Sequence, residues 1–130
     1  MEEALIDWLL ADSAIETIAG DRINWNVTKQ GSGKPSLVLT RVTGIPDYHM
    51  QGPSGLVRSL VQADCWATKY ETALALGRAA KARLSGIGAA EVDGFQKVSV
   101  INERHGFEPG AETAEQFHRV SLDFELWHSE

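Results

Sequence analysis

The stretch VQADCWATKYETA, residues 61–73, decides the fold because a strand pattern passes directly into a helix start within it. In a strand, successive side chains point to opposite faces of the sheet. Apolar and small side chains alternate onto one face over a slightly longer range, namely Val57, Val61, Ala63 and Cys65. Trp66 falls on the opposite, more polar face, which indicates partial cover there. We therefore predict a strand over about residues 56–67 with one buried face.

The helix that follows begins in the motif TKYE, residues 68–71. A Thr followed three residues later by Glu matches a capping box, in which each side chain satisfies a free backbone N–H at the helix start. The motif predicts a helix from about residue 69 to residue 84. Its predicted inner stripe consists of Tyr70, Ala73, Leu74, Gly77 and Leu84. Small residues in this stripe let the helix lie close to a sheet.

The remaining elements are predicted by the same patterns. Helical spacing predicts short helices over 3–11 and 13–19; the second starts with the capping-box pattern SAIE and stops at Gly20. Alternating patterns predict strands over 22–27, 36–43, 95–103 and 117–128, whereas Gly and Pro place loops at 44–55 and 104–116. We predict one α+β domain over residues 1–130. Its mostly antiparallel sheet of four or five strands carries the N-terminal helices and the longer central helix on one face.

Composition excludes several classes of protein. The net charge of -6 argues against a nucleic-acid binder that neutralises phosphates with clustered Lys and Arg. A single cysteine cannot form an internal disulfide, and the acidic start lacks the positive charge of a secretory signal, so we expect a protein made in a reducing cytoplasm. No apolar run reaches the roughly 20 residues that a membrane span needs, so no membrane role is expected.

The candidate chemical groups have more ordinary interpretations than catalysis. Cys65 alternates with apolar residues and follows Asp64, which indicates a packed thiol and not a nucleophile. The four histidines lack zinc-binding spacing, although a weak shared site between His49 and His105 is conceivable. GSGKPS, residues 31–36, fails the phosphate-loop pattern because Pro follows the Lys. The carboxylates Asp64, Asp123 and Glu125 fit the solvent-exposed face of strands. From all these groups together we expect no enzyme, metal or cofactor.

Two segments carry a resemblance to a known family. The segment GIPDYHMQGPSGLVRSLVQADCWATKYETALALGRAAKARL, residues 44–84, and the ending HRVSLDFELWH, residues 118–128, resemble the tail completion or tail terminator proteins of long-tailed bacteriophages and of phage-derived gene transfer agents. The resemblance implies a virion protein, assembled in the host cytoplasm, that forms a ring, typically a hexamer, on the head-proximal end of the tail tube. There it would stop tube polymerisation and join the tail to the head connector, or stopper, protein. It implies no catalysis or cofactor, and genome DNA would pass through the ring without sequence-specific binding.

Aromatic, Met and Arg side chains are enriched in the cores of protein interfaces. The candidate interface residues are therefore Trp25, Tyr48, His49, Met50, Trp66, Arg104, Phe107 and Trp127. The segments 44–55 and 104–116 are expected to contact the tube or the connector, and acidic side chains are expected to line the DNA channel. Three alternatives stay open: a head-closure or connector (neck) protein of the same particle, a small-ligand-binding α+β domain and, third, an enzyme that uses Cys65.

Overall fold

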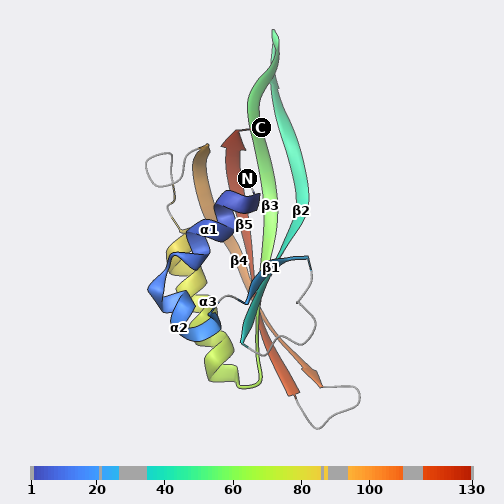
Figure 1. Cartoon of the computed structure of the whole chain (residues 1–130). Coiled ribbons are helices and arrows are strands. Elements are labelled where there is room, and N and C mark those ends of the chain that lie inside the picture. Colours follow the sequence, from blue (N-terminus) through green and yellow to red (C-terminus); the bar gives the residue numbers. More distant parts are fainter. Residues whose placement is uncertain are drawn as a thin grey trace.

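The computed structural model describes residues 2–20, 22–26, 35–85, 87, 94–109 and 116–129, and within them it shows three helices and one five-stranded sheet (Figure 1). In chain order the elements are α1 (Glu2–Leu10), α2 (Ser13–Ala19), β1 (Ile23–Trp25), β2 (Ser36–His49), β3 (Gly52–Ala67), α3 (Tyr70–Leu84), β4 (Phe95–Pro109) and β5 (Gln116–Ser129). None of these helices is long and apolar enough to cross a membrane.

The sheet has the strand order β1-β2-β3-β5-β4, with β3 in the middle. All neighbouring strands are antiparallel except the short β1, which pairs in parallel with β2. Cys65 on β3 lies opposite Leu37 of β2 and Val120 of β5. The predicted α+β class with a mostly antiparallel sheet is therefore confirmed.

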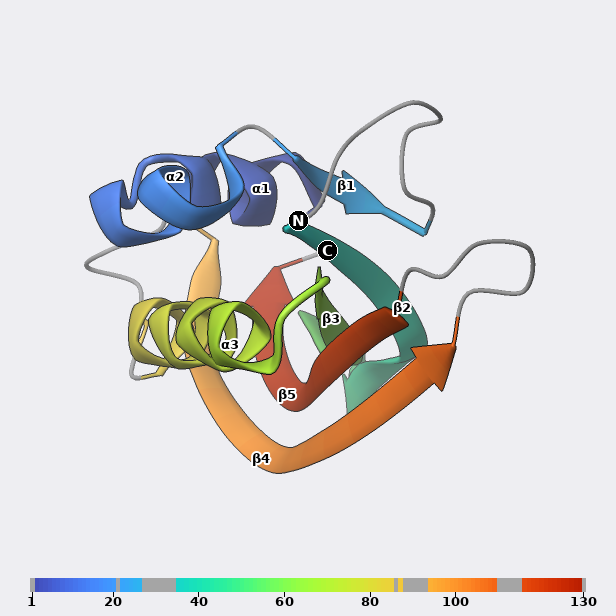
Figure 2. The same cartoon turned by 90° about the horizontal axis from the view of Figure 1, so that it is seen from below.

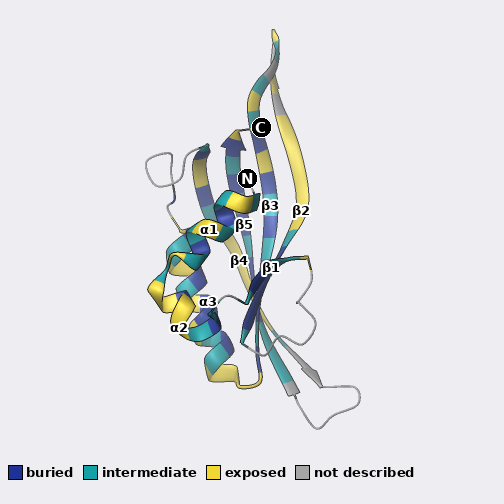
Figure 3. Ribbon diagram, viewed as in Figure 1, coloured by how far each residue is buried: buried dark blue, intermediate teal, exposed yellow. Residues whose placement is uncertain are grey.

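All three helices lie on the same side of the sheet (Figure 2). The buried side chains of the two layers form one apolar core. Figure 3 marks the positions of buried residues on the helices and strands. On β3 and β5 alternate residues are buried, as the sequence pattern predicted: Val57, Val61, Ala63 and Cys65 on β3, and Val120, Leu122, Phe124 and Leu126 on β5. The hydrophobic effect of this buried face is the main reason that the helices stay on the sheet.

The buried stripe of α3 differs in part from the prediction. Ala73, Gly77 and Leu84 are buried as expected, and Leu76 is also in the core. Leu74, in contrast, is only partly buried, and Tyr70 is 41% exposed. Tyr70 is the first helical residue, so its side chain lies at the end of the contact with the sheet and turns to β4 and β5 instead.

Both predicted capping boxes are wrong. The N-cap of α2 is Asp12, whose carboxylate accepts a hydrogen bond from the backbone N–H of Ala14 at 3.3 Å. The N-cap of α3 is Lys69 instead of Thr68, and it makes no side-chain cap bond, because its ammonium group has no acceptor for a backbone N–H. The predicted stop at Gly20 is confirmed: its φ is 60°, a conformation that favours glycine, and its N–H closes the last turn of α2.

The first predicted long loop, 44–55, is largely strand, and so is the described part of the second, 104–116, of which residues 110–115 lie outside the described residues. β2 runs to His49 and β3 begins at Gly52, so a two-residue connection joins them, and β4 continues to Pro109. Gly and Pro suggested loops, but β1 covers the outer side of β2 only at residues 37–39. A proline is tolerated along the uncovered edge, because the missing N–H breaks no bond there. β1 is shorter than predicted, since Asn26 has a φ of 66° and ends it.

Trp8 and Arg83 join α1 to α3 by a reciprocal contact. The Trp8 indole N–H donates to the carbonyl oxygen of Arg83 at 3.0 Å, and Nε of Arg83 donates to the carbonyl oxygen of Trp8 at 2.9 Å. The guanidinium also lies 3.6 Å from the centre of the indole, a favourable cation–π geometry. The first helix is thereby fixed to the central one.

Gly77 marks the closest approach of α3 to β5. A Cβ at this position would lie 2.7 Å from Cγ1 of Val120. Ala is a better helix former than Gly by about 1 kcal/mol, but forcing an extra methyl into a packed core costs about 1–3 kcal/mol. We expect Gly77→Ala to lower the free energy of unfolding by about 1–2 kcal/mol in urea denaturation. In a Val120→Ala background the same change should be neutral or stabilising, and a stabilised Gly77→Ala in the natural background would contradict this packing.

Candidate interaction surfaces

The β2–β3 hairpin projects beyond the rest of the sheet (Figure 1). The pairing of β3 with β5 ends at Leu56 opposite Ser129, so the residues nearer the tip have no β5 neighbour. We call residues 44–56 the hairpin arm. Its exposed apolar side chains are Ile45 (48% exposed), Tyr48 (66%) and Met50, which is fully exposed at the tip. Clustered exposed apolar side chains of this kind are typical of surfaces that bind another molecule.

Figure 3 shows exposed residues along the outer part of β2, which forms one side of this arm. Two of the predicted interface residues, Tyr48 and Met50, therefore lie together on a projecting structure. His49 lies between them in β2, but its side chain is outside the described part of the structure. The sequence pattern missed Ile45 as a member of this group, because the segment was taken for an irregular loop.

A second surface is the face of the sheet that no described helix covers, which we call the open face. Three predicted interface residues lie on it: Trp66, Arg104 and Trp127. Arg104 pairs with Asp123 at 3.0 Å, and the Trp127 indole N–H donates to Glu125 at 2.9 Å. The Arg119 guanidinium lies 5.4 Å from the centre of the Trp66 ring. These side chains of the open face already have partners within the chain.

The carboxylates of the open face do not form an acid–base pair. Asp64 accepts hydrogen bonds from the Ser121 hydroxyl at 2.6 Å and from the Gln62 amide at 2.9 Å. Asp123 accepts from Arg104 and from Asn102, and Glu125 lies 3.6 Å from Arg58. Each carboxylate thus has its own donors, so these groups join neighbouring residues and strands of the sheet.

A third surface is a pocket of about 450 Å³ between α1 and the edge formed by β1 and β2, which we call the acidic pocket. Its lining residues are Glu2, Glu3, Ile6, Asp7, Trp25, Asn26 and Arg41. The Trp25 indole N–H donates to the carbonyl oxygen of Glu2 at 3.1 Å, which fixes the ring as part of the wall. Trp25 is therefore half-buried, with one side on the core and the other at the pocket.

Among the pocket carboxylates, Glu2 forms an ion pair with Arg41 at 3.2 Å. A hydrogen bond to the backbone lowers the pKa of the Glu2 carboxyl, and the positive charge of Arg41 acts in the same direction. Glu2 is thus held in its charged form. The sequence pattern missed this pocket because its residues come from three elements that lie far apart in the chain.

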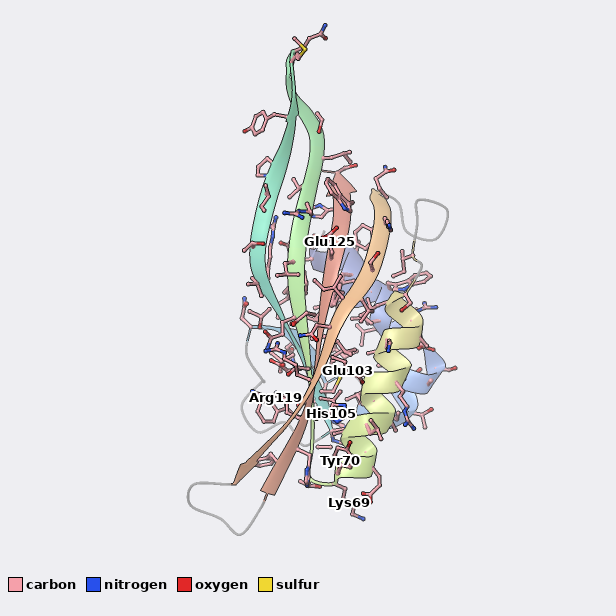
Figure 4. The ribbon with its side chains drawn as sticks, turned by 180° about the vertical axis from the view of Figure 1, so that it is seen from behind. Lys69, Tyr70, Glu103, His105, Arg119 and Glu125 are labelled. Carbon is pink, nitrogen blue, oxygen red and sulfur yellow. The ribbon has the colours of Figure 1, made fainter. Side chains whose placement is uncertain are left out.

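The Tyr70 ring lies close to two histidines from neighbouring strands, His105 on β4, which is labelled in Figure 4, and His118 on β5. The Tyr70 hydroxyl lies 2.9 Å from Nδ1 of His105, and the rings of His105 and His118 both lie 5.8 Å from the tyrosine ring. The predicted pairing of His49 with His105 falls on a side chain outside the described residues. Within the described ranges, no three His, Cys, Asp or Glu side chains are placed to hold a metal ion.

Phe107 and Cys65 are two further candidates from the sequence whose positions the structure gives. Phe107 lies in β4 opposite His118, and its side chain is outside the described part of the chain. Cys65 is fully buried, as its alternation predicted. Burial and the neighbouring Asp64 carboxylate raise the pKa of the Cys65 thiol. The thiol thus stays protonated at neutral pH, which is the opposite of what a nucleophilic cysteine requires.

Comparison with known proteins agrees with the resemblance of residues 44–84 and 118–128. The chain matches the family described as tail completion protein gp17 over residues 3–129. It belongs to this family. As a tail completion protein it is a structural component of a phage or phage-like virion, so the expected class and location are confirmed.

A solved structure supports the fold of this tail completion protein. The chain is similar to a protein in the virion of a native gene transfer agent particle, with a TM-score of 0.74 and 15% sequence identity. The similarity covers 100% of this chain and 95% of that chain. At this level of identity the likeness concerns the fold. A search of curated proteins found no match.

The raised pKa and the burial of Cys65 predict an unreactive thiol. At pH 8 the folded protein should react with a thiol reagent such as dithionitrobenzoate at least about a hundredfold more slowly than the urea-unfolded chain. Cys65→Ala should lower the free energy of unfolding by about 1 kcal/mol, because a buried sulfur is removed. Rapid, stoichiometric labelling of the folded protein would contradict the packed position.

Proposed function

We propose that this tail completion protein caps the head-proximal end of the tail tube, stops tube polymerisation and forms the joint to the head connector. It acts as a ring of identical subunits, with six the number that the family resemblance implies. It has no catalytic or cofactor role in this proposal. Family membership supports the tail location, and the hairpin arm is the single structural observation that carries the capping role.

The hairpin arm has the reach and surface for such a contact. Its tip lies about five residues beyond the last β3–β5 pair, which at about 3.3 Å per residue corresponds to roughly 15 Å. The two strands are hydrogen-bonded to each other up to the pair His49–Gly52, so the arm presents Tyr48 and Met50 on a regular backbone. An arm of this kind contacts a neighbouring protein at modest entropic cost, because its backbone is ordered before binding.

The overall charge fits a ring through which DNA passes. The chain carries a net charge of -6, so its surface repels phosphates and does not retain the genome. This supports passage of DNA without sequence-specific binding.

The alternative of a head-closure protein differs in the partner that the ring binds first. A tail-capping protein binds finished tail tubes in the absence of heads, whereas a head-closure protein binds DNA-filled heads in the absence of tails. Mixing the purified protein separately with tubes and with tail-less heads, followed by negative-stain electron microscopy, distinguishes the two. Binding to heads alone would contradict the capping proposal.

The capping role predicts that the exposed tip of the arm is essential for assembly but not for folding. Met50→Asp should raise the concentration of protein needed to stop tube growth at least about tenfold, because it places a charge at an apolar contact. Tube lengths measured by electron microscopy give this concentration. The free energy of unfolding should change by less than about 0.5 kcal/mol, since the side chain is fully exposed.

The matched control is Thr68→Asp, which adds the same charge at an exposed position near the other end of β3. It should cap tubes as the natural chain does. Equal capping by Met50→Asp and the natural protein would show that the arm tip does not touch the tube.

A further inference from the structure

The helical layer carries opposite charges at its two ends. Residues 2–20, which form α1 and α2, contain five acidic residues and no Lys or Arg. Residues 69–83, which form most of α3 and its N-cap, contain four basic residues and one acidic residue. The two ends also lie over different parts of the sheet: α1 contacts β1 at one edge, and α3 packs on β3, β5 and β4 towards the other edge.

The acidic pocket retains two carboxylates without an ion-pair partner within the described ranges. Glu3 and Asp7 are exposed and lie one helical turn apart on the same side of α1. Glu2 is already paired with Arg41. Ile6 and the Trp25 ring form the apolar and aromatic part of the pocket wall. A site with carboxylates beside an indole favours a guanidinium, which binds carboxylates in a forked geometry and stacks on aromatic rings.

Arg78 is the side chain of α3 best placed to supply that group. It is exposed and forms no ion pair with another described residue, whereas Lys81 lies 3.9 Å from Glu103 and Arg83 is held by Trp8. Two of its neighbours on the helix surface, Ala75 and Ala82, are exposed and small. Another molecule can therefore approach Arg78 closely from the side of these two residues.

We propose that Arg78 of one copy of this chain inserts into the acidic pocket of a second copy, between Glu3, Asp7 and Trp25. Charge complementarity indicates that a second copy of the chain binds there, since the chain itself carries both the acidic pocket and an exposed arginine that fits it. The contact joins two different surfaces near opposite edges of the sheet, which is the head-to-tail arrangement that produces rings. The proposal rests on the ring proposed above and names a contact between its subunits.

The Trp8–Arg83 contact shows the same chemistry inside one chain. There a guanidinium stacks on an indole at 3.6 Å while its Nε–H donates to a backbone carbonyl oxygen. The acidic pocket offers a guanidinium the same combination, with carboxylates in place of the backbone carbonyl. A lysine at position 78 would keep the positive charge, but its ammonium group could neither stack on the indole nor bind a carboxylate through two parallel hydrogen bonds.

A charge swap tests the contact. We compare the natural chain, Arg78→Glu, Asp7→Arg and the double variant, and measure the concentration for half-assembly by light scattering and, on tail tubes, by electron microscopy. Each single variant should raise this concentration by about tenfold or more, because it places two like charges opposite each other in the contact. The double variant should recover to within about threefold of the natural chain. Arg78→Lys should give partial assembly.

Matched controls carry the same charge changes outside the contact. Glu16→Lys alters an exposed acidic residue of α2 that does not line the pocket, and Lys69→Glu alters an exposed basic residue at the start of α3. Both should assemble like the natural chain.

The outcomes separate this contact from the capping role. Assembly of Arg78→Glu at the natural concentration, or no recovery in the double variant, would overturn the contact while capping by the natural chain still stands. Impaired capping by Asp7→Arg but not by Arg78→Glu would assign the pocket to the tube protein and also overturn it. A natural chain that stays monomeric in solution and on tubes would overturn the ring and the contact together.

Discussion

The pairing of β3 with β5 is the interaction on which the rest of this structure depends. Twelve residue pairs in unbroken register place every second side chain of both strands on the same face. That face is apolar, and it can be removed from water only by the helices packed on it. Gly77 allows α3 to approach β5 closely, and α1 and α2 then cover the part of the sheet next to it. The hairpin arm exists because β3 begins at Gly52, whereas its pairing with β5 ends at Leu56.

The sequence pattern was sufficient for those parts of the fold that depend on alternation and on burial. It placed the core face of β3 and β5, the position of Cys65 and the limits of α3, because a period of two or 3.6 residues is a local property. It failed where tertiary pairing overrides local preference. Gly44, Pro46 and Gly52 suggest a loop when they are considered alone, but the strand ladder holds the backbone extended through them.

The surfaces were harder to predict, and for a physical reason. Tyr48 and Met50 were identified as candidate contacts because aromatic and Met side chains are enriched in interface cores, and the structure places both, exposed, on the hairpin arm. Trp66 and Trp127 were chosen on the same grounds, yet both have partners on the open face. The acidic pocket could not be predicted, because it forms only when α1, β1 and β2 come together.

The reciprocal contact between Trp8 and Arg83 has a geometric consequence. It fastens α1 to α3 by two hydrogen bonds and a stacked cation, so the two ends of the helical layer cannot rotate independently. The chain then holds its two sides at a fixed angle to each other. In any closed assembly that uses both sides, this angle sets the curvature, and the curvature sets how many copies complete a full turn.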